Sequence, residues 1–464
     1  MLSLIASLLL GGCAAVPEMA PAPRVIPAPS IARMLGSPSG QQEWPGEGWW
    51  TDFADPQLTA LITEGLEGAS DLRVAEARYA RAEALVRQTR NVLLPSLNGS
   101  AEGGATKQSY NYLVPEAFAP KGWPDYGQGS LRLDWELDFW GRNRAALAAA
   151  RSEAQAARME AAAARLAVSA GVAGAYVDLA GLYAERDAAE HAIEVRTRTL
   201  ALMRERRTQG LEHDGAIERA QSALATAQGE RASLDEALTL SRNRIAVLIG
   251  AGPDRGMEIT RPSLTIPTNA GVPSNLPAEL IGRRPDVLAA RLRSEAAASR
   301  IKQAKASFYP NVNLAGVIGL QALGIGNVFK SGSEFGTVGP AISLPIFDGG
   351  RLRGQYRAAE ADYHAAVAQY DGALAQALRE VADAIGSDRA LQQRLDRAEE
   401  ADRAATVAWR VATNRYRGGL ATYLDVLTAE DALIATRRSV TSMKTRSFAL
   451  DVALIRALGG GFRS

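Results

Sequence analysis

The chain has 464 residues, and its 52 Lys and Arg against 51 Asp and Glu leave a net charge of +1, so no global field favours nucleic acid or another polyanion. One cysteine excludes a disulfide framework and a multi-thiolate metal site, and the three histidines form no HxxxH or HxH pair. No GxxxxGKS, GxSxG or HExxH motif and no credible catalytic carboxylate pair is present, so we expect no enzymatic activity and no bound nucleotide, metal or other cofactor.

A short apolar run precedes the single cysteine. Residues 2–10 read LSLIASLLL, which is too short to span a bilayer as a helix and is typical of a signal-peptide core. The next residues, GGC, resemble the lipobox of bacterial lipoproteins, which implies a signal peptide and a covalent lipid on Cys13. Ala14 implies sorting to the outer membrane by the same resemblance. No Lys or Arg precedes the run, so a start codon upstream of the given sequence remains open.

The rest of the chain contains two copies of one pattern. Residues 74–95 align with residues 289–310 at an offset of 215 (310 − 95), and both segments are predicted helices that stop at a proline. The glycine turn at Gln209-Gly210-Leu211 aligns with Gly418-Gly419-Leu420 at an offset of 209 (420 − 211). The change of offset predicts a loop six residues longer in the first copy (215 − 209).

These patterns divide the chain into five segments. Each repeat is predicted to contain a helix, two strands and a long helical hairpin. The segments are a signal peptide (1–12), a lipidated N-terminus with a Pro-rich extended tether (13–50), a first repeat (51–250), a linker (251–277) and a second repeat (278–464).

One segment of the first copy alternates strictly between two kinds of residue. Its apolar positions are Leu131, Leu133, Trp135, Leu137 and Phe139, and its charged positions are Arg132, Asp134, Glu136 and Asp138. A period of two predicts a strand with one face toward lipid or a core and the other toward water. The length suits a tilted membrane strand, and an ordinary half-buried strand of a soluble sheet fits equally well.

Residues 142–209 contain no proline and predict one very long helix. At 1.5 Å per residue this helix would reach about 100 Å, which no compact domain accommodates. Ala170, Ala173, Val177 and Ala180 recur at spacings of three and four and predict a narrow coiled-coil seam, while the other faces are charged. A soluble coiled-coil tether is the alternative interpretation.

Four motifs in this order resemble the TolC-like outer-membrane efflux proteins, in particular their OprM/NodT lipoprotein branch. The motifs are IGRRPDV (281–287), AKASFYP (304–310), IFDGGR (346–351) and YRGGLATYLDVL (416–427). The resemblance covers nearly the whole mature chain and implies a mixed α and β membrane fold. In this fold three chains, each giving four strands, form a twelve-stranded outer-membrane β-barrel continued by a periplasmic α-helical barrel. Trimerisation agrees with the physics, because four strands alone would leave unpaired edges in lipid.

The resemblance also assigns functional positions. Arg132, Asp134, Glu136 and Asp138 would face the aqueous lumen. The tips at Gly210, Leu211, Gly418, Gly419 and Leu420 would line the periplasmic entrance and contact an adaptor protein. Glycine at these positions is also explained by the tight turn between two helices alone.

Leu424, Asp425, Thr428 and Asp431 would form the closed periplasmic gate by the same resemblance. The family often has an acidic residue in the place of Thr428 and a basic one in the place of Asp431. Any polar contacts that close the gate in this chain must therefore pair different residues. We expect Asp431 either to pair with a base elsewhere, such as Arg219 or Arg415, or to be solvated.

The predicted function is the passive exit duct of a tripartite efflux pump, of the RND type, for drugs or other small molecules. The predicted location is the outer membrane of a Gram-negative bacterium, with the helices in the periplasm. The predicted partners are two further copies of the chain, a periplasmic adaptor, an inner-membrane transporter and outer-membrane lipid, without nucleic acid. A duct for type I protein secretion and a non-conducting envelope lipoprotein coiled coil are the alternatives. The coiled coil leaves the duplicated strand pairs unexplained.

Overall fold

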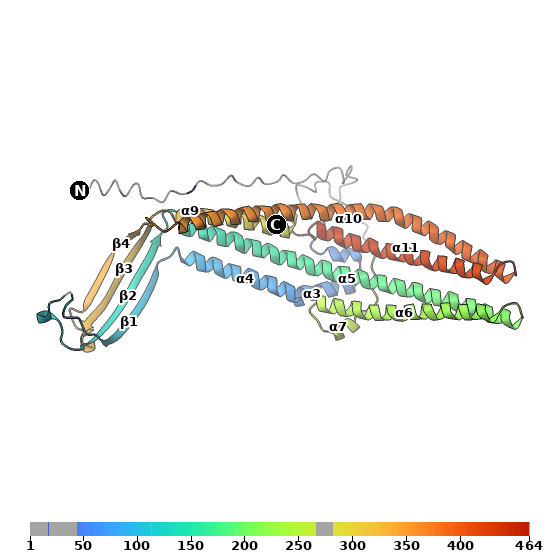
Figure 1. Cartoon of the computed structure of the whole chain (residues 1–464), viewed down its shortest axis with the longest axis horizontal. Helices are drawn as coiled ribbons and strands as arrows, with labels where there is room; N and C mark the ends of the chain where they lie inside the picture. Colours follow the sequence, from blue (N-terminus) through green and yellow to red (C-terminus); the bar gives the residue numbers. More distant parts are fainter. Residues whose placement is uncertain (1–16, 18–43, 113, 266–281, 464) are drawn as a thin grey trace. The chain divides into compact units, whose positions relative to one another are not determined.

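The computed structural model describes residue 17 and residues 44–112, 114–265 and 282–463. The predicted signal peptide, the lipidated Cys13, most of the tether and part of the linker lie outside the described residues. The elements are η1 (Trp49–Phe53), α3 (Pro56–Gly68), α4 (Ser70–Asn91), β1 (Ser96–Ala105), η2 (Glu116–Phe118), β2 (Asp125–Leu137), α5 (Arg142–Thr208), α6 (Asp214–Leu248), α7 (Pro253–Met257), α9 (Pro285–Ala306), β3 (Asn311–Leu323), η3 (Ile325–Asn327), β4 (Glu334–Ser343), α10 (Arg351–Arg417) and α11 (Tyr423–Ala457) (Figure 1).

The internal duplication is confirmed element by element. Helices α4 and α9 have 22 residues each, α5 and α10 have 67 each, and α6 and α11 have 35 each. Among the described residues, the first copy also contains α3, which the sequence patterns did not predict. Asp55 starts α3 by accepting hydrogen bonds from the backbone N–H groups of Gln57 (2.9 Å) and Leu58 (3.2 Å).

The chain divides into two compact units, which are described separately. Among the described residues, the strand unit contains 79–112, 114–157 and 290–370, and the hairpin unit contains 44–78, 158–265, 282–289 and 371–463. In the strand unit, β1, β2, β3 and β4 form one antiparallel sheet in chain order, and the β2–β3 pair joins the two copies. This sheet is open at both edges within one chain.

The AKASFYP motif packs the base of the strand unit. Phe308 is buried and meets the ring of Tyr356 edge to face, at 6.3 Å between centroids. Tyr309 stacks on Trp140 at 4.8 Å, and the indole N–H of Trp140 donates to the carbonyl of Pro310 at 2.8 Å. The motif therefore connects the start of β3 to the strand-to-helix turn of the first copy.

In the hairpin unit, α5 with α6 and α10 with α11 form two helical hairpins (Figure 1). The apolar core lies where η1 and α3 pack on α5 and α11, and it includes Phe53, Leu58, Tyr176 and Val452. Asp55 also accepts hydrogen bonds here from the Tyr176 hydroxyl (2.9 Å) and the Ser263 backbone (2.8 Å). In the described residues α5 contains one stretch long and apolar enough to span a membrane, but 61% of it is buried within the protein, as in an ordinary core helix.

The IGRRPDV motif connects the start of α9 to the end of α11. The Arg284 guanidinium, which is buried, binds both carboxylate oxygens of Asp286 (3.0 and 2.6 Å) and one of Glu380 (2.7 Å). It also donates to the backbone carbonyl of Ala457, the last residue of α11, at 3.2 Å. Burial opposes the charge of Arg284, but the two carboxylates hold its pKa above the usual range. The motif therefore has a structural role.

Candidate functional site: strand sheet, hairpin tips and gate segment

The strand sheet has one apolar and one polar face. The register pairs Leu131 with Ile318 and Gly316 with Val338, so these side chains share a face across three strands. Arg132 pairs with Asn98 and with Val317 on the other face. The apolar face is not covered by this chain, since Leu131 is 48%, Ile318 65% and Val338 76% exposed. Such a face must meet lipid or another protein.

The predicted lumen residues divide into two groups. Arg132, Asp134 and Glu136 lie on β2 and, being two residues apart, share the polar face. The carboxylate of Glu136 also binds the guanidinium of Arg142 with both oxygens, at 2.7 and 2.6 Å. The prediction that Asp138 lies on the strand is wrong, because β2 ends at Leu137.

Asp138 instead binds the start of α5. Its carboxylate accepts hydrogen bonds from the backbone N–H groups of Asn143 (3.1 Å) and Arg144 (2.8 Å), which a helix leaves unpaired in its first turn. In the second copy, Asp348 of the IFDGGR motif binds the backbone of Leu352 in the same way, at 2.9 Å. These two aspartates make the turn from strand to helix.

Both hairpin tips have the same backbone geometry. Gly210 and Gly419 have φ angles of +75° and +72°, a conformation that favours glycine. The N–H of Leu211 donates to Arg206 O (2.9 Å), and the N–H of Leu420 donates to Arg415 O (2.8 Å), as in a Schellman turn. Gly418 lies in the second turn. Leu211 is 58% and Leu420 73% exposed, so each tip presents a leucine that its own chain does not bury.

The two tips contact each other through a buried tyrosine that the sequence did not mark. The Tyr416 hydroxyl donates to the Glu212 carboxylate at 2.7 Å, and the Arg206 guanidinium lies 4.5 Å from the Tyr416 ring centroid. Burial alone would raise the pKa of Glu212. The hydrogen bond from the Tyr416 hydroxyl and the nearby cations lower this pKa by more than burial raises it, so the net pKa is below its usual value. Met203 packs against the same tyrosine.

The four predicted gate residues lie on the exposed side of α11, directly after the second tip. Leu424 is 67% exposed. Asp425 forms a capping box with Thr422, whose hydroxyl donates to it at 2.8 Å, and Thr428 donates to the Leu424 carbonyl at 2.8 Å. Asp425 and Thr428 are therefore engaged within their own helix.

Asp431 pairs with a base that the sequence reasoning did not name. Its carboxylate accepts from the Arg196 guanidinium of α5 at 3.0 Å, and not from Arg219 or Arg415. The same guanidinium donates to the Ala223 carbonyl of α6 at 2.8 Å. Arg415 instead donates to the Leu420 carbonyl at 3.3 Å.

A second acid, Glu430, completes what we call the Arg196 cluster, namely Arg196, Thr199, Glu430 and Asp431. Glu430 is buried, accepts from the Thr199 hydroxyl at 2.9 Å and lies 3.9 Å from the Arg196 guanidinium. Burial raises the pKa of Glu430, and Thr199 and Arg196 oppose this only in part. The cluster joins the two hairpins by polar contacts. No group of three or more His, Cys, Asp or Glu that could hold a metal occurs in the described residues.

Comparison with known proteins identifies this architecture. A model of the outer membrane efflux protein family matches residues 61–251 and 276–460. The fusaric acid resistance protein FusA of Burkholderia cepacia is 34% identical over 77% of this chain and 68% of its own length. The solvent efflux pump outer membrane protein SrpC of Pseudomonas putida is 28% identical over 99% of this chain and 98% of its own. The outer membrane protein VceC of Vibrio cholerae has a solved structure that is 44% identical, covers 90% of this chain and 100% of that one, and has a TM-score of 0.86.

These comparisons confirm the family resemblance, the TolC-like fold with two repeats, and the role as a non-enzymatic outer-membrane component of an efflux pump that extends into the periplasm. The segment boundaries and the individual site residues stay predictions. The chain belongs to the outer membrane efflux protein family.

Proposed function

We propose that three copies of this chain form one tubular channel, which is the passive exit duct of a tripartite efflux pump. An inner-membrane transporter of the RND type supplies the energy, a periplasmic adaptor binds the hairpin tips, and a lipid on Cys13 anchors each chain. The names of two relatives, a fusaric acid resistance protein and a solvent efflux pump protein, support small organic molecules as the cargo.

The observation that carries this proposal is the two-faced open sheet. Its apolar face is uncovered, and its edges β1 and β4 have unpaired backbone groups on their outer sides. Lipid provides no hydrogen bonds for such edges, so the sheet must be closed by strands of other copies. Arg132, Asp134 and Glu136 then line a water-filled lumen while Leu131 and Ile318 face lipid.

Two neighbouring residues of β3 test this orientation. A lysine at a lipid-facing position near the bilayer centre costs about 2–4 kcal/mol per chain, whereas a lumen-facing lysine remains hydrated. We expect Ile318→Lys to abolish assembly of a membrane-inserted trimer and Val317→Lys to preserve it. The readouts are the mass of the solubilised particle by native mass spectrometry and its conductance in a planar bilayer.

The two lysine variants also define the result that would contradict the proposed channel. Equal tolerance of Ile318→Lys and Val317→Lys, or a particle that is not a conducting trimer, would contradict the channel. Conductance in wild type also separates the channel from a non-conducting coiled coil, which gives no current.

The tips and the gate segment have distinct proposed roles. The exposed Leu211 and Leu420 provide apolar contacts for the adaptor, since exposed leucines beside a turn bind by burial in a partner. Leu424, Asp425, Thr428 and Asp431 face the periplasmic entrance, and the Arg196 cluster holds the second hairpin against the first. Breaking the Arg196 to Asp431 ion pair would favour the open entrance.

A further inference from the structure

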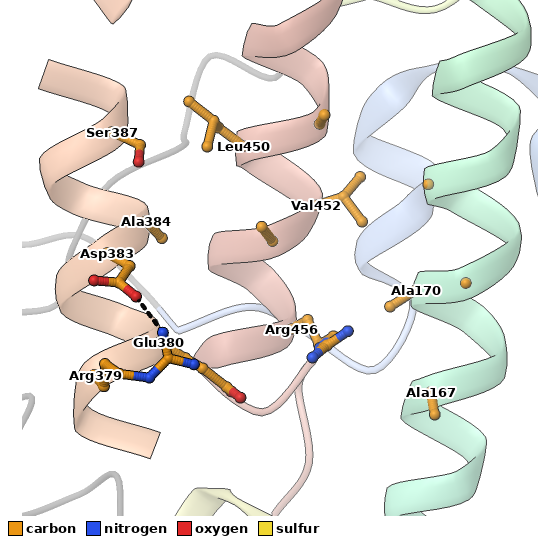
Figure 2. Close-up of a pocket in the computed structure, with 14 residues that line it drawn as sticks. Ala167, Ala170, Arg379, Glu380, Asp383, Ala384, Ser387, Leu450, Val452 and Arg456 are labelled. Carbon is orange, nitrogen blue, oxygen red and sulfur yellow. Dashed lines mark hydrogen bonds and ion pairs between the residues drawn. The ribbon is translucent and has the colours of Figure 1, made fainter. Parts of the chain in front are cut away.

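A recess of about 430 Å³ lies between α5, α10 and α11 in the hairpin unit, outside the tips and the gate segment. Its size falls in the range of small-molecule sites. The lining residues that the argument uses are Gly174 and Ala453, together with Ala170, Arg379, Asp383 and Arg456, which Figure 2 labels. Small residues of α5 and α11 leave the space open, and charged residues of α10 and α11 border it.

Gly174 leaves space on the α5 side of the recess, and no neighbouring group of the described residues requires a glycine there. At Gly181 on the same helix, an added Cβ would lie 2.6 Å from a methyl of Thr445, so close packing explains that glycine. At Gly174 an added Cβ would meet nothing within 4 Å. Glycine inside a helix lowers stability by about 0.5–1 kcal/mol relative to alanine. Close packing within the chain does not explain why Gly174 is retained at this cost in stability.

The recess contains one cation without a direct partner. Arg379 is paired with Asp383 at 2.6 Å, and Glu380 is paired with Arg284 at 2.7 Å. In the described part of the chain, the Arg456 guanidinium makes no hydrogen bond or ion pair, although its field reaches Glu380. In Figure 2 this guanidinium lies between α11 and α5, while Arg379 and Asp383 meet on α10.

The recess opens away from the outer elements of the hairpin unit. On α5, Val168, Val172 and Leu179 belong to the core that η1 and α3 cover. Ala170 belongs to both the core and the recess, and at 100° per residue the other recess positions 167, 171 and 174 lie about 110° around the helix from this covered face. In a tube, added elements such as α3 must lie outside, because inside they would block the lumen. This step rests on the proposed function and directs the recess toward the channel axis.

We propose that this Arg456 recess binds a small amphipathic organic anion during its passage through the channel. The apolar body of the ligand packs on the small side chains of α5 and α11, and its single carboxylate or sulfonate pairs with Arg456. Arg456 is the one arginine of the recess without a hydrogen bond or ion pair in the described residues, so its guanidinium can pair with one negative charge, and neutral and cationic analogues of the same shape bind less tightly.

Three probes of one shape test the charge preference. They are 4-(trifluoromethyl)benzoate, 4-(trifluoromethyl)benzamide and 4-(trifluoromethyl)benzylamine, titrated by fluorine NMR against the full-length protein in lipid nanodiscs. We expect the benzoate to bind most tightly. Arg456→Ala should weaken the benzoate about fivefold, the upper end for an exposed ion pair, and leave the benzamide unchanged.

Two further variants make the result specific. Arg446→Ala removes an exposed arginine of the same helix that does not line the recess, and it should change nothing. Gly174→Leu fills the floor of the recess at a position with free space, and it should weaken binding of all three probes without changing the particle mass or lowering the thermal stability.

Equal binding of the three probes, no binding to wild type, or unchanged benzoate affinity in Arg456→Ala would each overturn the recess as an anion site. Conductance of the same samples keeps this outcome separate from the proposed function. A conducting trimer that does not bind benzoate refutes the recess alone, and a particle that does not conduct refutes the duct.

Discussion

Asp451 on α11 is a buried acid with an unfavourable environment, and its replacement tests the electrostatic reasoning. The residue is 7% exposed, and one carboxylate oxygen, Oδ2, has no hydrogen-bond partner in the described residues. Burial, together with the negative charge of Asp388 on α10, raises the pKa of Asp451 from 3.8 to about 6. The charged form is therefore less stable in the folded chain than in the unfolded chain.

The pH window follows from these two pKa values. Between pH 3.8 and about 6 the unfolded state releases the Asp451 proton while the folded state retains it, so stability falls as the pH rises. Above pH 6 the full loss is present, and a shift of this size corresponds to about 3 kcal/mol per chain. Asp451→Asn has no proton to release, so this part of the pH dependence should disappear.

The assay is thermal unfolding of the detergent-solubilised protein at fixed scan rate, at pH 4.5, 6 and 8. For a chain of this length the entropy of unfolding is about 1 kcal/mol per degree. The unfolding midpoint of wild type should therefore fall by about 2 °C more than that of Asp451→Asn between pH 4.5 and pH 8. Asp396→Asn, at an exposed acid of α10, is the matched control and should follow wild type. Parallel pH curves for wild type and Asp451→Asn would refute the reasoning.

Three further predictions concern the gate, a turn and the anchor. Leu424→Ala and Asp431→Ala should each raise dye and antibiotic uptake of whole cells, for Asp431 by up to about fivefold, the population shift that an ion pair of 1 kcal/mol allows; uptake equal to wild type would remove these residues from the gate. Gly459→Ala should destabilise the hairpin unit by about 1–3 kcal/mol, because the residue has a φ of +94° and a Cβ would clash with the Arg283 carbonyl; an unchanged unfolding midpoint would argue against this strain. Cys13→Ser should abolish incorporation of labelled palmitate, and a variant that still incorporates it would exclude Cys13 as the lipid site.

The sequence predicts most of the fold because duplication and periodicity are backbone-level signals. The absence of proline predicts residues 142–209 as one helix, and α5 ends within one residue of this, at Thr208. The period of two predicts β2 only from Leu131, whereas the strand begins at Asp125. Its first part, DYGQGS, contains glycine and small polar residues and therefore has no alternation to detect.

The site was less predictable because its polar partners come from distant parts of the chain. Gly210 and Gly419 were found by local turn chemistry, and both have the expected left-handed conformation. Arg196, the partner of Asp431, is 235 residues away in sequence, and nothing in the charge pattern of α5 separates it from its other arginines. Asp138 fits the alternation of a strand, but its carboxylate lies beside the start of α5 and accepts a hydrogen bond from the backbone of that helix instead.

The distribution of polar and apolar contacts suggests where the hairpin unit can move. At its base, α5 and α11 are joined by the larger apolar core, and Arg284 binds the end of α11 to α10 and to the start of α9. Toward the tips, the hairpins are joined by a smaller apolar cluster, which includes Met203 and Tyr423, together with the Arg196 cluster and the Tyr416 to Glu212 hydrogen bond. Water can replace polar contacts at small net cost, whereas exposing apolar surface costs free energy in proportion to its area. Separation of the two hairpins should therefore begin at the tips and stop at the base.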